Sequence, residues 1–585
     1  MGVRTYESDV SRMPRSLPRG PSLVSALGLG AVLLVLLLSN GRPIGAGDTR
    51  PTERVAASLV QEGNFDLDEY PEIEPPFARA QGEHRVSIYP VLSAVLATPV
   101  FAAVRGLALL DETGTALAGK LAASLLSALA ALVLYLALGR RYPTRDAAWA
   151  AVVFALGTSV WSTSQALWQH PAAVLFLSLA LLFWLRADDG EASWAGRAGL
   201  PLALALAARP ADVALVAVLG CAFALRWPRE LPRLLLWALG PVLFVLAYQW
   251  RYFGSPFEHG FSGTLGRFSE PWGQGQLGLL VSPAKGLLIF TPVAFVAGVG
   301  LVRAFRRGER ALAGALGLAV LAHLTLMGRW SEWHGGEGWG PRLMTDALPL
   351  LFLFLPEGLS VMGHLGTALA LVSIGVQVLG AFAYDYRWER LYQREGASAR
   401  SVLWDVGRSP IFFYMGERVV RPALPGRRGD RAIVREYPVV LFGPSGSRVS
   451  FAAPKPKVEG SERILTDVLL ERGARVEGDR LRLRGRFDGL FFRVRDNARP
   501  RRLEVRIAGK GRGTLYVGER SFASGITKWA EYKVSGDFRL KHSYEFARSG
   551  GPDLFVGLGK DAGEADLEWV AMVPPTEPES VIRLQ

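Results

Sequence analysis

The chain has 585 residues, of which half are hydrophobic and one fifth are charged, and its formal net charge is +13. Arginines in short loops beside apolar stretches explain this charge, and the sequence contains no nucleic-acid-binding motif, so nucleic acid is excluded as a partner. The single cysteine, Cys221, excludes a disulfide framework and a cysteine-based zinc cluster within the chain.

The N-terminal tail, residues 1–21, is polar and basic, and the apolar run after it lacks a small-residue cleavage site. We therefore predict an uncleaved first membrane span. A spanning helix needs about 20 mostly apolar residues, and about eleven stretches within residues 22–385 meet this rule. They are residues 22–39, 88–110, 115–138, 146–164, 167–186, 196–226, 232–250, 284–304, 310–328, 343–361 and 364–383. The sixth stretch contains Arg209-Pro210, which predicts a kink.

Basic residues in short loops predict the orientation of the spans. The tail and the loops 226–233 and 303–310 are basic, so we place them in the cytoplasm. The first external loop, residues 40–86, and the C-terminal domain then lie outside. The loop 140–145 is also basic, although the span count places it outside. Either a nearby span is re-entrant or the count is wrong at this point.

The pattern changes after the last span, and residues 386–585 predict an all-β, sandwich-like domain. Short runs alternate apolar and polar side chains, which is typical of half-buried antiparallel strands. These runs begin at Arg480, Leu490, Arg502 and Thr514. The domain has either a structural role or binds glycan through exposed aromatic residues. Candidates for the second role are Trp529, Tyr532 and Tyr544.

The first external loop carries the clearest chemical signal. Thr49, Pro51 and Gly63 predict the limits of a short helix with one apolar stripe, which is typical of a helix in the membrane interface. Asp48 then lies at the mouth of the first span. A carboxylate at this place can act as general base on a hydroxyl or an amine. The alternative is a solvated loop acid near a helix N-terminus.

Several motifs occur in a recognisable order. Asp48 and the amphipathic helix are followed by Gly-Asn-Phe-Asp-Leu-Asp, Ser-Ile-Tyr89-Pro, Ser-Gln-Ala-Leu-Trp-Gln-His170-Pro, Ser-Pro-Ala-Lys285-Gly and Trp-Gly-Pro-Arg342-Leu-Met-Thr-Asp. In this order, residues 22–385 resemble the GT-C glycosyltransferase superfamily, which includes the protein O-mannosyltransferases and the lipid A aminoarabinose transferases. They are most similar to its uncharacterised bacterial members.

The resemblance implies transfer of a sugar from a polyprenyl-phosphate donor on the external face of a bacterial inner membrane, with inversion at the anomeric carbon. The acceptor is a glycan, a lipid or a protein. Asp48 matches the catalytic acid of the family. Thr49 stands where many members have a second acid, so Glu53, the next acid, is the second catalytic candidate.

A polyprenyl-phosphate donor requires cations, because the leaving phosphate gains charge in the transition state. We expect Arg209, Lys285 and Arg342 to bind it. Two structural alternatives to donor binding remain. Arg209 pairs with Asp212 one helical turn away, and the ammonium of Lys285 extends to the membrane interface.

The loop 328–340 supplies further substrate-binding candidates: Trp333, His334, Glu337 and Trp339. The tryptophans either stack on a sugar or belong to an interfacial aromatic belt. Tyr89 and His170 are candidates from their motifs. No cofactor is expected. A divalent metal with His334 and Glu337 as ligands is an alternative that the sequence does not support. Asp66-Leu67-Asp68 matches the short acidic motif that binds metal in soluble nucleotide-sugar transferases, but no nucleotide-binding βαβ pattern surrounds it, so it is interpreted as a solvated loop.

The resemblance thus implies an inverting membrane glycosyltransferase. Two alternatives remain: a transporter or flippase of lipid-linked glycans, and a polymerase or ligase of surface polysaccharide.

Overall fold

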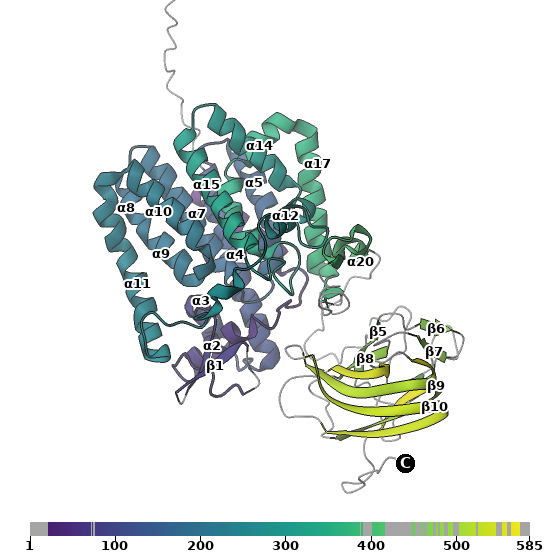
Figure 1. Ribbon diagram of the computed structural model, residues 1–585. Helices are drawn as coiled ribbons and strands as arrows, with labels where there is room; N and C mark the ends of the chain where they lie inside the picture. Colours follow the sequence, from purple (N-terminus) through teal and green to yellow (C-terminus); the bar gives the residue numbers. More distant parts are fainter. Residues whose placement is uncertain are drawn as a thin grey trace, which may run out of the picture. The chain divides into compact units, whose positions relative to one another are not determined.

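The computed structural model describes residues 21–415, except 72, 74, 75, 83, 387 and 390–400, and beyond them the strands between residues 447 and 573 together with residues 484 and 563. The chain divides into two compact units (Figure 1). Unit 1 consists of Met1–Glu69 and Phe77–Arg421, and unit 2 of Tyr70–Pro76 and Pro422–Gln585. The basic tail before residue 21 lies outside the described residues.

Unit 1 is helical. Its α-helices are α1 (Leu23–Leu38), α2 (Arg50–Gln61), α3 (Leu92–Gly106), α4 (Glu112–Leu138), α5 (Thr144–Leu156), α6 (Ser159–Thr163), α7 (His170–Asp188), α8 (Ser193–Arg197), α9 (Gly199–Ala208), α10 (Val213–Arg226), α11 (Leu231–Phe253), α12 (Gln274–Val281), α13 (Leu287–Phe290), α14 (Val293–Arg306), α15 (Arg310–Gly328), α16 (Leu348–Phe352), α17 (Leu355–Phe382) and α20 (Pro410–Met415). Its 3₁₀ helices are η1 (Pro210–Asp212), η2 (Pro228–Glu230), η3 (Thr264–Arg267), η4 (Arg342–Ala347) and η5 (Val406–Arg408). A two-stranded antiparallel hairpin joins β1 (Ala78–Gln81) to β2 (His84–Ser87).

Five helical segments of unit 1 are long and apolar enough to cross a membrane, among the described residues. They are Thr113–Leu138, His170–Asp188, Pro228–Phe253, Arg310–Gly328 and Leu355–Phe382. The last contains a sharp break at Gly363, where φ is 54°. The prediction of a helical membrane protein is therefore confirmed, whereas the count of eleven spans is not.

Helices α1 and α4 run in opposite directions. A Cβ built on Gly139, after the end of α4, would lie only 2.1 Å from Cδ of Pro21, just before α1. Towards the other ends, the ammonium of Lys120 in α4 donates a hydrogen bond to the carbonyl of Arg42 just after α1, at 2.8 Å. We call these two ends of unit 1 the Pro21 end and the Asp48 end, because Asp48 follows Arg42 in the same loop.

Helix α3 begins and ends at the Asp48 end. Phe77 would obstruct a Cβ on Gly47 at 2.6 Å, and its carbonyl accepts a hydrogen bond from the amide of Ile88 at 3.3 Å, so the chain enters α3 beside the loop of Asp48. Helix α4 starts at this end shortly after α3 stops, and α3 packs along α2. If α3 crossed the membrane, α4 would have to start at the Pro21 end, because only a short loop joins the two helices. The predicted span 88–110 is therefore wrong.

The predicted span 196–226 is also wrong, because it forms two helices that fold back on each other. Gly199, at the start of α9, contacts the first turn of α11. Arg226, at the end of α10, pairs with Asp188 at the end of α7, at 2.6 Å. Arg209, at the turn, instead shares a carboxylate partner with the first residue of α7. The predicted break at Arg209 is thus a reversal of direction.

The basic loop 140–145 lies at the Pro21 end, directly after α4. Arg140 pairs with Asp189, and Arg141 pairs with Glu309 in the basic loop before α15. The loop therefore shares one end with the other basic loops of unit 1. The span count placed it outside because it counted α3 as a crossing. The count also took α9 and α10 together as one crossing, although they reverse direction. The two errors cancel, so the later basic loops were placed on the correct side relative to the first one.

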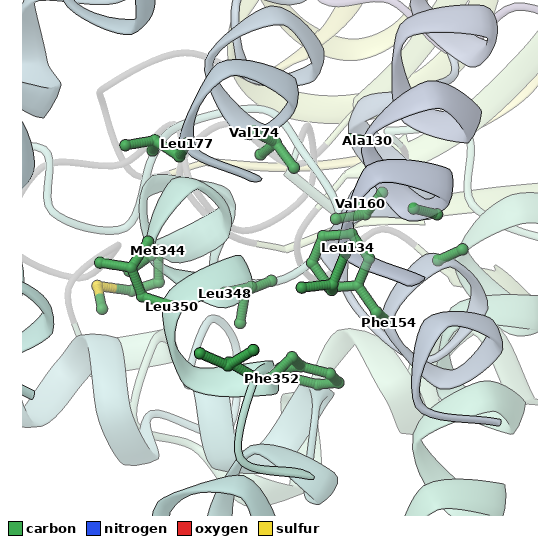
Figure 2. Close-up of a cluster of buried hydrophobic side chains, with 14 of the residues drawn as sticks. Ala130, Leu134, Phe154, Val160, Val174, Leu177, Met344, Leu348, Leu350 and Phe352 are labelled. Carbon is green, nitrogen blue, oxygen red and sulfur yellow. The ribbon is translucent and has the colours of Figure 1, made fainter. Parts of the chain in front are cut away.

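The core next to η4 is built from helices far apart in the sequence. Buried side chains of α4, α5, α6 and α7 pack against η4 and α16 (Figure 2). They include Ala130, Leu134, Phe154, Val160, Val174, Leu177, Met344, Leu348, Leu350 and Phe352. Close packing of this kind fixes the position of a short helix that has few hydrogen bonds of its own.

The described residues of unit 2 form a ten-stranded antiparallel sheet. Its strands are β3 (Ser447–Ser450), β4 (Val458–Glu459), β5 (Leu465–Glu471), β6 (Arg475–Glu477), β7 (Arg480–Leu483), β8 (Gly489–Val494), β9 (Arg502–Ser521), β10 (Gly525–Glu545), β11 (Asp553–Leu558) and β12 (Glu564–Val573). The hydrogen-bonded order is β4-β3-β12-β9-β11-β8-β5, with β10 beside β9, and with β7 pairing both β12 and β6.

The predicted C-terminal β-structure is confirmed, and its two layers remain a prediction. In β7 the leucines Leu481 and Leu483 are buried while the arginines beside them are not, as period-two alternation requires. Two predicted runs, from Arg502 and from Thr514, form the single strand β9. Of the candidate aromatics, Tyr532 is buried, and the side chains of Trp529 and Tyr544 lie outside the described residues.

Candidate functional site

Asp48 lies at the centre of a polar site at the Asp48 end of unit 1. The loop after α1 places it, because Gly47 packs against Phe77. Oδ2 of Asp48 accepts a hydrogen bond from Arg342 at 2.6 Å, although 294 positions separate the two residues. The two side chains keep 18% and 16% exposure, so the pair is not sealed inside the protein.

Arg342 is held on two sides. Its Cζ lies 4.4 Å from the centre of the Trp168 ring, a cation–π contact that leaves its donors available. The glycine-rich loop before η4 lies along its side chain: a Cβ on Gly335 would lie 3.1 Å from Cγ of Arg342, and one on Gly338 would lie 3.3 Å from Cδ. We call Asp48, Trp168 and Arg342 the Asp48 cluster.

The carboxyl group of Asp48 is poised to accept a proton. Burial raises its pKa above the ordinary value, and the guanidinium of Arg342 opposes this shift. Oδ1 of Asp48 and Nε of Arg342 are buried and have no hydrogen-bond partner among the described residues. Buried polar atoms without partners are uncommon in proteins, so these two point to a ligand.

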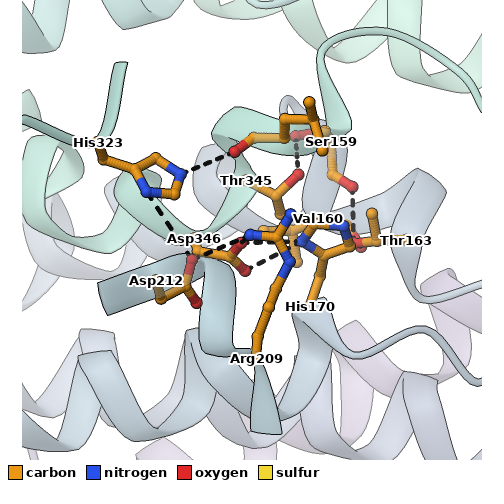
Figure 3. A network of polar contacts seen from close by, with 10 residues as sticks. Ser159, Val160, Thr163, His170, Arg209, Asp212, His323, Thr345 and Asp346 are labelled. Atoms are coloured by element: carbon orange, nitrogen blue, oxygen red, sulfur yellow. Dashed lines mark hydrogen bonds and ion pairs between the residues drawn. The ribbon is translucent and has the colours of Figure 1, made fainter. Parts of the chain in front are cut away.

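A second group of charged side chains surrounds Asp346 of η4 (Figure 3). Oδ2 of Asp346 contacts Nδ1 of His170 at 3.0 Å and accepts a hydrogen bond from Arg209 at 2.8 Å. Arg209 also donates to Oδ1 of Asp212 at 3.0 Å. Nε2 of His323 lies 2.8 Å from the Leu343 carbonyl, so it is the protonated ring nitrogen. We call His170, Arg209, Asp212, His323 and Asp346 the Asp346 network.

The Asp346 network connects to the Asp48 cluster through the backbone of η4, which carries both Arg342 and Asp346. The hydroxyl of Thr345, also in η4, contacts that of Ser159 at 2.7 Å. The partners of η4 lie in α6, in α7, in the turn after α9 and in α15, so four separate segments hold η4 in place. The pairing alternative for Arg209 is realised, and His170 positions η4 from within the protein.

Lys285 holds the glycine-rich loop. It is buried, and Nζ donates to the carbonyls of Gly336 and Gly338 and, at 3.0 Å, to the carboxylate of Glu389. The hydroxyl of Tyr384 donates to the same carboxylate oxygen at 2.8 Å. Lys285 therefore does not extend to the membrane interface. Its ammonium group is bound by three acceptors of the protein itself.

Glu53 contacts α4 and the segment before α7. Its Oε1 accepts a hydrogen bond from the amide of Leu167 at 3.4 Å, and a Cβ on Gly119 would lie 2.9 Å from the carboxyl group. The side chain thus connects α2 to α4 and to the segment before α7. A catalytic role of Glu53 stays a prediction.

The carboxyl group of Glu53 predicts a pH-dependent stability. Burial raises its pKa from 4.5 to about 7, so the folded protein favours the protonated form. The protonated carboxyl group contributes at most about 3 kcal/mol to the free energy of unfolding. This contribution is fully present below the ordinary pKa and is lost as pH rises through about 7. We expect Glu53→Gln to be more stable than the natural chain near pH 8 and nearly equal to it near pH 5, in thermal unfolding of detergent-purified protein. Glu62→Gln, at the exposed end of α2, is the matched control, and an equal gain in both variants would contradict the account.

The other substrate-binding candidates lie in three different environments. Tyr89 belongs near the cluster: burial raises the pKa of its phenol, and the charge of Asp48 raises it further. Trp333 and Trp339 are each 3% exposed, so their rings serve as core and leave no face for a sugar. His334 and Glu337 are partly exposed, and Nδ1 of His334 accepts a hydrogen bond from the amide of Gly336 at 3.1 Å.

The interpretation of Asp66-Leu67-Asp68 as a solvated loop is wrong for Asp66, which is buried. Asp66, Asp68 and His84 form one of two groups in the described part of the chain whose ligand atoms are close enough to hold a metal. The other is Asp212, His323 and Asp346. There the guanidinium of Arg209 already bridges the two carboxylates, and its charge disfavours a cation.

Four residues of these groups were not assigned from the sequence. They are Trp168, Asp346, Glu389 and His323, the last of which lies inside the predicted span 310–328. Trp168 and Asp346 stand in the quoted motifs, next to candidates, but only the fold shows their partners. Glu389 lies beyond the last predicted span, in a stretch without a recognisable motif. A buried lysine in a membrane domain does signal a missing acidic partner, and that signal points to a residue such as Glu389.

No family model and no curated protein matches the chain. Solved structures similar to it include archaeal oligosaccharyltransferase AglB from Archaeoglobus fulgidus, with 12% identity and a TM-score of 0.38 over 71% of this chain and 62% of that one. ArnT from Cupriavidus metallidurans has 14% identity and a TM-score of 0.41, over 65% and 68% of the two chains. Arabinosyltransferase EmbB from Mycobacterium smegmatis has 12% identity and a TM-score of 0.35, over 96% and 66%.

These three proteins share the GT-C fold, the group that the sequence motifs resemble. The chain spans less than two thirds of the length of the AglB chain. At these TM-scores the likeness carries no argument about activity. The function proposed below therefore rests on the residues of the site.

Proposed function

We propose that this protein is a membrane glycosyltransferase that moves a sugar from a polyprenyl-phosphate donor to an acceptor at the Asp48 end. The observation that carries the proposal is the Asp48 cluster. It joins a buried carboxylate oxygen without a partner to an arginine that also has a donor without a partner, among the described residues. A base and a cation side by side suit proton removal from an acceptor and binding of a phosphate leaving group.

In the proposed reaction, the acceptor hydroxyl or amine attacks the anomeric carbon. Oδ1 of Asp48 takes the acceptor proton. The new bond to the anomeric carbon forms while the bond from this carbon to the phosphate oxygen breaks, and the electron pair leaves with the phosphate. Arg342 stabilises the negative charge that develops there. Attack opposite the leaving group inverts the anomeric centre.

In this proposal the Asp48 end faces outward and the Pro21 end lies in the cytoplasm. The basic loops support the orientation, since all three of those described lie at the Pro21 end. A bacterial inner membrane is the setting that the resemblance implies. Lys285 and Arg209 are positioning residues, because their charges are engaged by carboxylates of the protein.

A flippase of lipid-linked glycans is the second candidate, because the reversal at Arg209 resembles the interrupted helices that transporters use at their binding sites. Reconstitution into vesicles separates the two. We expect the purified chain to transfer labelled sugar from a polyprenyl-phosphate donor to an acceptor pool supplied on the outside. Movement of the intact labelled lipid across the bilayer, with no new glycosidic bond, would contradict the glycosyltransferase and favour the flippase.

A further inference from the structure

A group of three side chains in the first external loop lies outside the proposed reacting groups. Asp66 and Asp68 follow α2, and His84 is the first residue of β2. The amide of Leu67 donates a hydrogen bond to the carbonyl of Arg85 at 2.8 Å, so this segment runs beside β2. The pairing brings both carboxylates to the imidazole.

The ligand atoms are spaced as a cation requires. Nδ1 of His84 lies 2.9 Å from Oδ2 of Asp68 and 3.7 Å from Oδ2 of Asp66. One atom from each of the three residues lies within 4.8 Å of the other two. A divalent ion bound at about 2.0–2.2 Å has neighbouring ligand atoms about 3.0–3.6 Å apart, so small side-chain movements complete the site.

The burial of Asp66 is a separate observation that points to a ligand at this site. Asp66 is 3% exposed, yet its Oδ1 is buried and has no hydrogen-bond partner among the described residues. The carboxylate of Asp68 accepts a hydrogen bond from the amide of Arg85 at 2.7 Å, and the carboxylate of Asp66 has a backbone hydrogen bond with Asp68. A buried carboxylate oxygen without a partner is costly, and a bound cation would remove that cost.

We propose that Asp66, Asp68 and His84 bind a divalent transition-metal cation such as Zn²⁺ or Mn²⁺. An imidazole nitrogen among the ligands distinguishes this set from the all-oxygen sets that Ca²⁺ and Mg²⁺ prefer. Three protein ligands leave at least one coordination position for water. The ion fastens the segment after α2 to β2, and it is not required by the proposed transfer reaction.

Metal titration of the full-length, chelator-treated protein in detergent tests the proposal. We expect isothermal titration with Zn²⁺ or Mn²⁺ to show one site per chain. His84→Ala and Asp66→Asn are each expected to weaken binding at least tenfold. The metal is expected to raise the unfolding temperature of the natural chain and leave that of His84→Ala unchanged. His84 is partly exposed, so its variant decides the question if Asp66→Asn does not fold.

His259→Ala is the matched control, since His259 is an exposed histidine in a later loop of the same unit. It is expected to bind the metal as the natural chain does. Unchanged affinity in His84→Ala, or an equal loss in His259→Ala, would overturn the proposal. Asp48→Asn is expected to retain full metal affinity, so that failure of the metal site and failure of the proposed reaction are separate results.

Discussion

Asp48→Asn is expected to lower the turnover number for sugar transfer by about 10²–10⁴-fold, which is the usual contribution of a general base. The amide has the shape of the carboxylate and still offers an oxygen to Arg342, so the contact at 2.6 Å can be kept. What is lost is the ability to take a proton. Steady-state kinetics should therefore show a fall in turnover with little change in the Michaelis constant for the donor.

The pH profile separates this role from a structural one. Since burial raises the pKa of Asp48, the activity of the natural chain should fall as pH drops through a value above the ordinary one for aspartate. Asp48→Asn should lack that limb. Asp111→Asn is the matched control, because Asp111 caps α4 through the Gly114 amide and asparagine caps equally well. Full turnover in Asp48→Asn would remove this residue from the mechanism.

Asp346→Asn is expected to destabilise unit 1 by about 3 kcal/mol, the lower part of the range for breaking a buried ion pair. The replacement removes the charge that holds His170 and Arg209, while Arg209 keeps Asp212 as a partner. Because η4 also carries Arg342, sugar transfer should fall together with stability. Thermal unfolding in detergent measures the loss of stability. The rate of sugar transfer from the donor at low temperature measures the loss of activity.

The control for Asp346→Asn is Asp189→Asn, which breaks the partly exposed pair with Arg140 at the Pro21 end. Exposed ion pairs contribute about 0–1 kcal/mol, so this variant should be nearly as stable as the natural chain and fully active. Equal stability of the two variants would show that the buried network does not hold η4. A stable but inactive Asp346→Asn would instead place Asp346 among the reacting groups.

Spans and strands were predictable where the signal is local. The alternation around Leu481 and Leu483 is a property of adjacent residues, and β7 follows it. Length and apolarity do not show the direction of a helix, which is why 88–110 and 196–226 were both interpreted as crossings. The break at Arg209-Pro210 was visible in the sequence, but a kink and a reversal look the same until the helix ends find their partners.

The candidate site was predictable one residue at a time, and its pairings were not. Asp48 and Arg342 were both singled out, yet nothing in the sequence joins two residues 294 positions apart. Asp66 shows the opposite failure. It lies between the apolar residues Phe65 and Leu67, but the sequence does not show that this segment pairs with β2 and that the pairing buries the carboxylate.

The glycine-rich loop around Arg342 has a consequence for how the protein tolerates change. Gly335 has a φ of +75° and Gly340 a φ of +74°, a region that other residues rarely adopt. A methyl group on Gly335 would also press on Arg342, and one on Gly340 would lie 3.0 Å from the ring of Phe290. Every single-nucleotide missense change in a glycine codon adds a side chain. In a saturation mutagenesis library selected for function, these two positions should be nearly invariant, and the loop is a poor place for an inserted label or epitope.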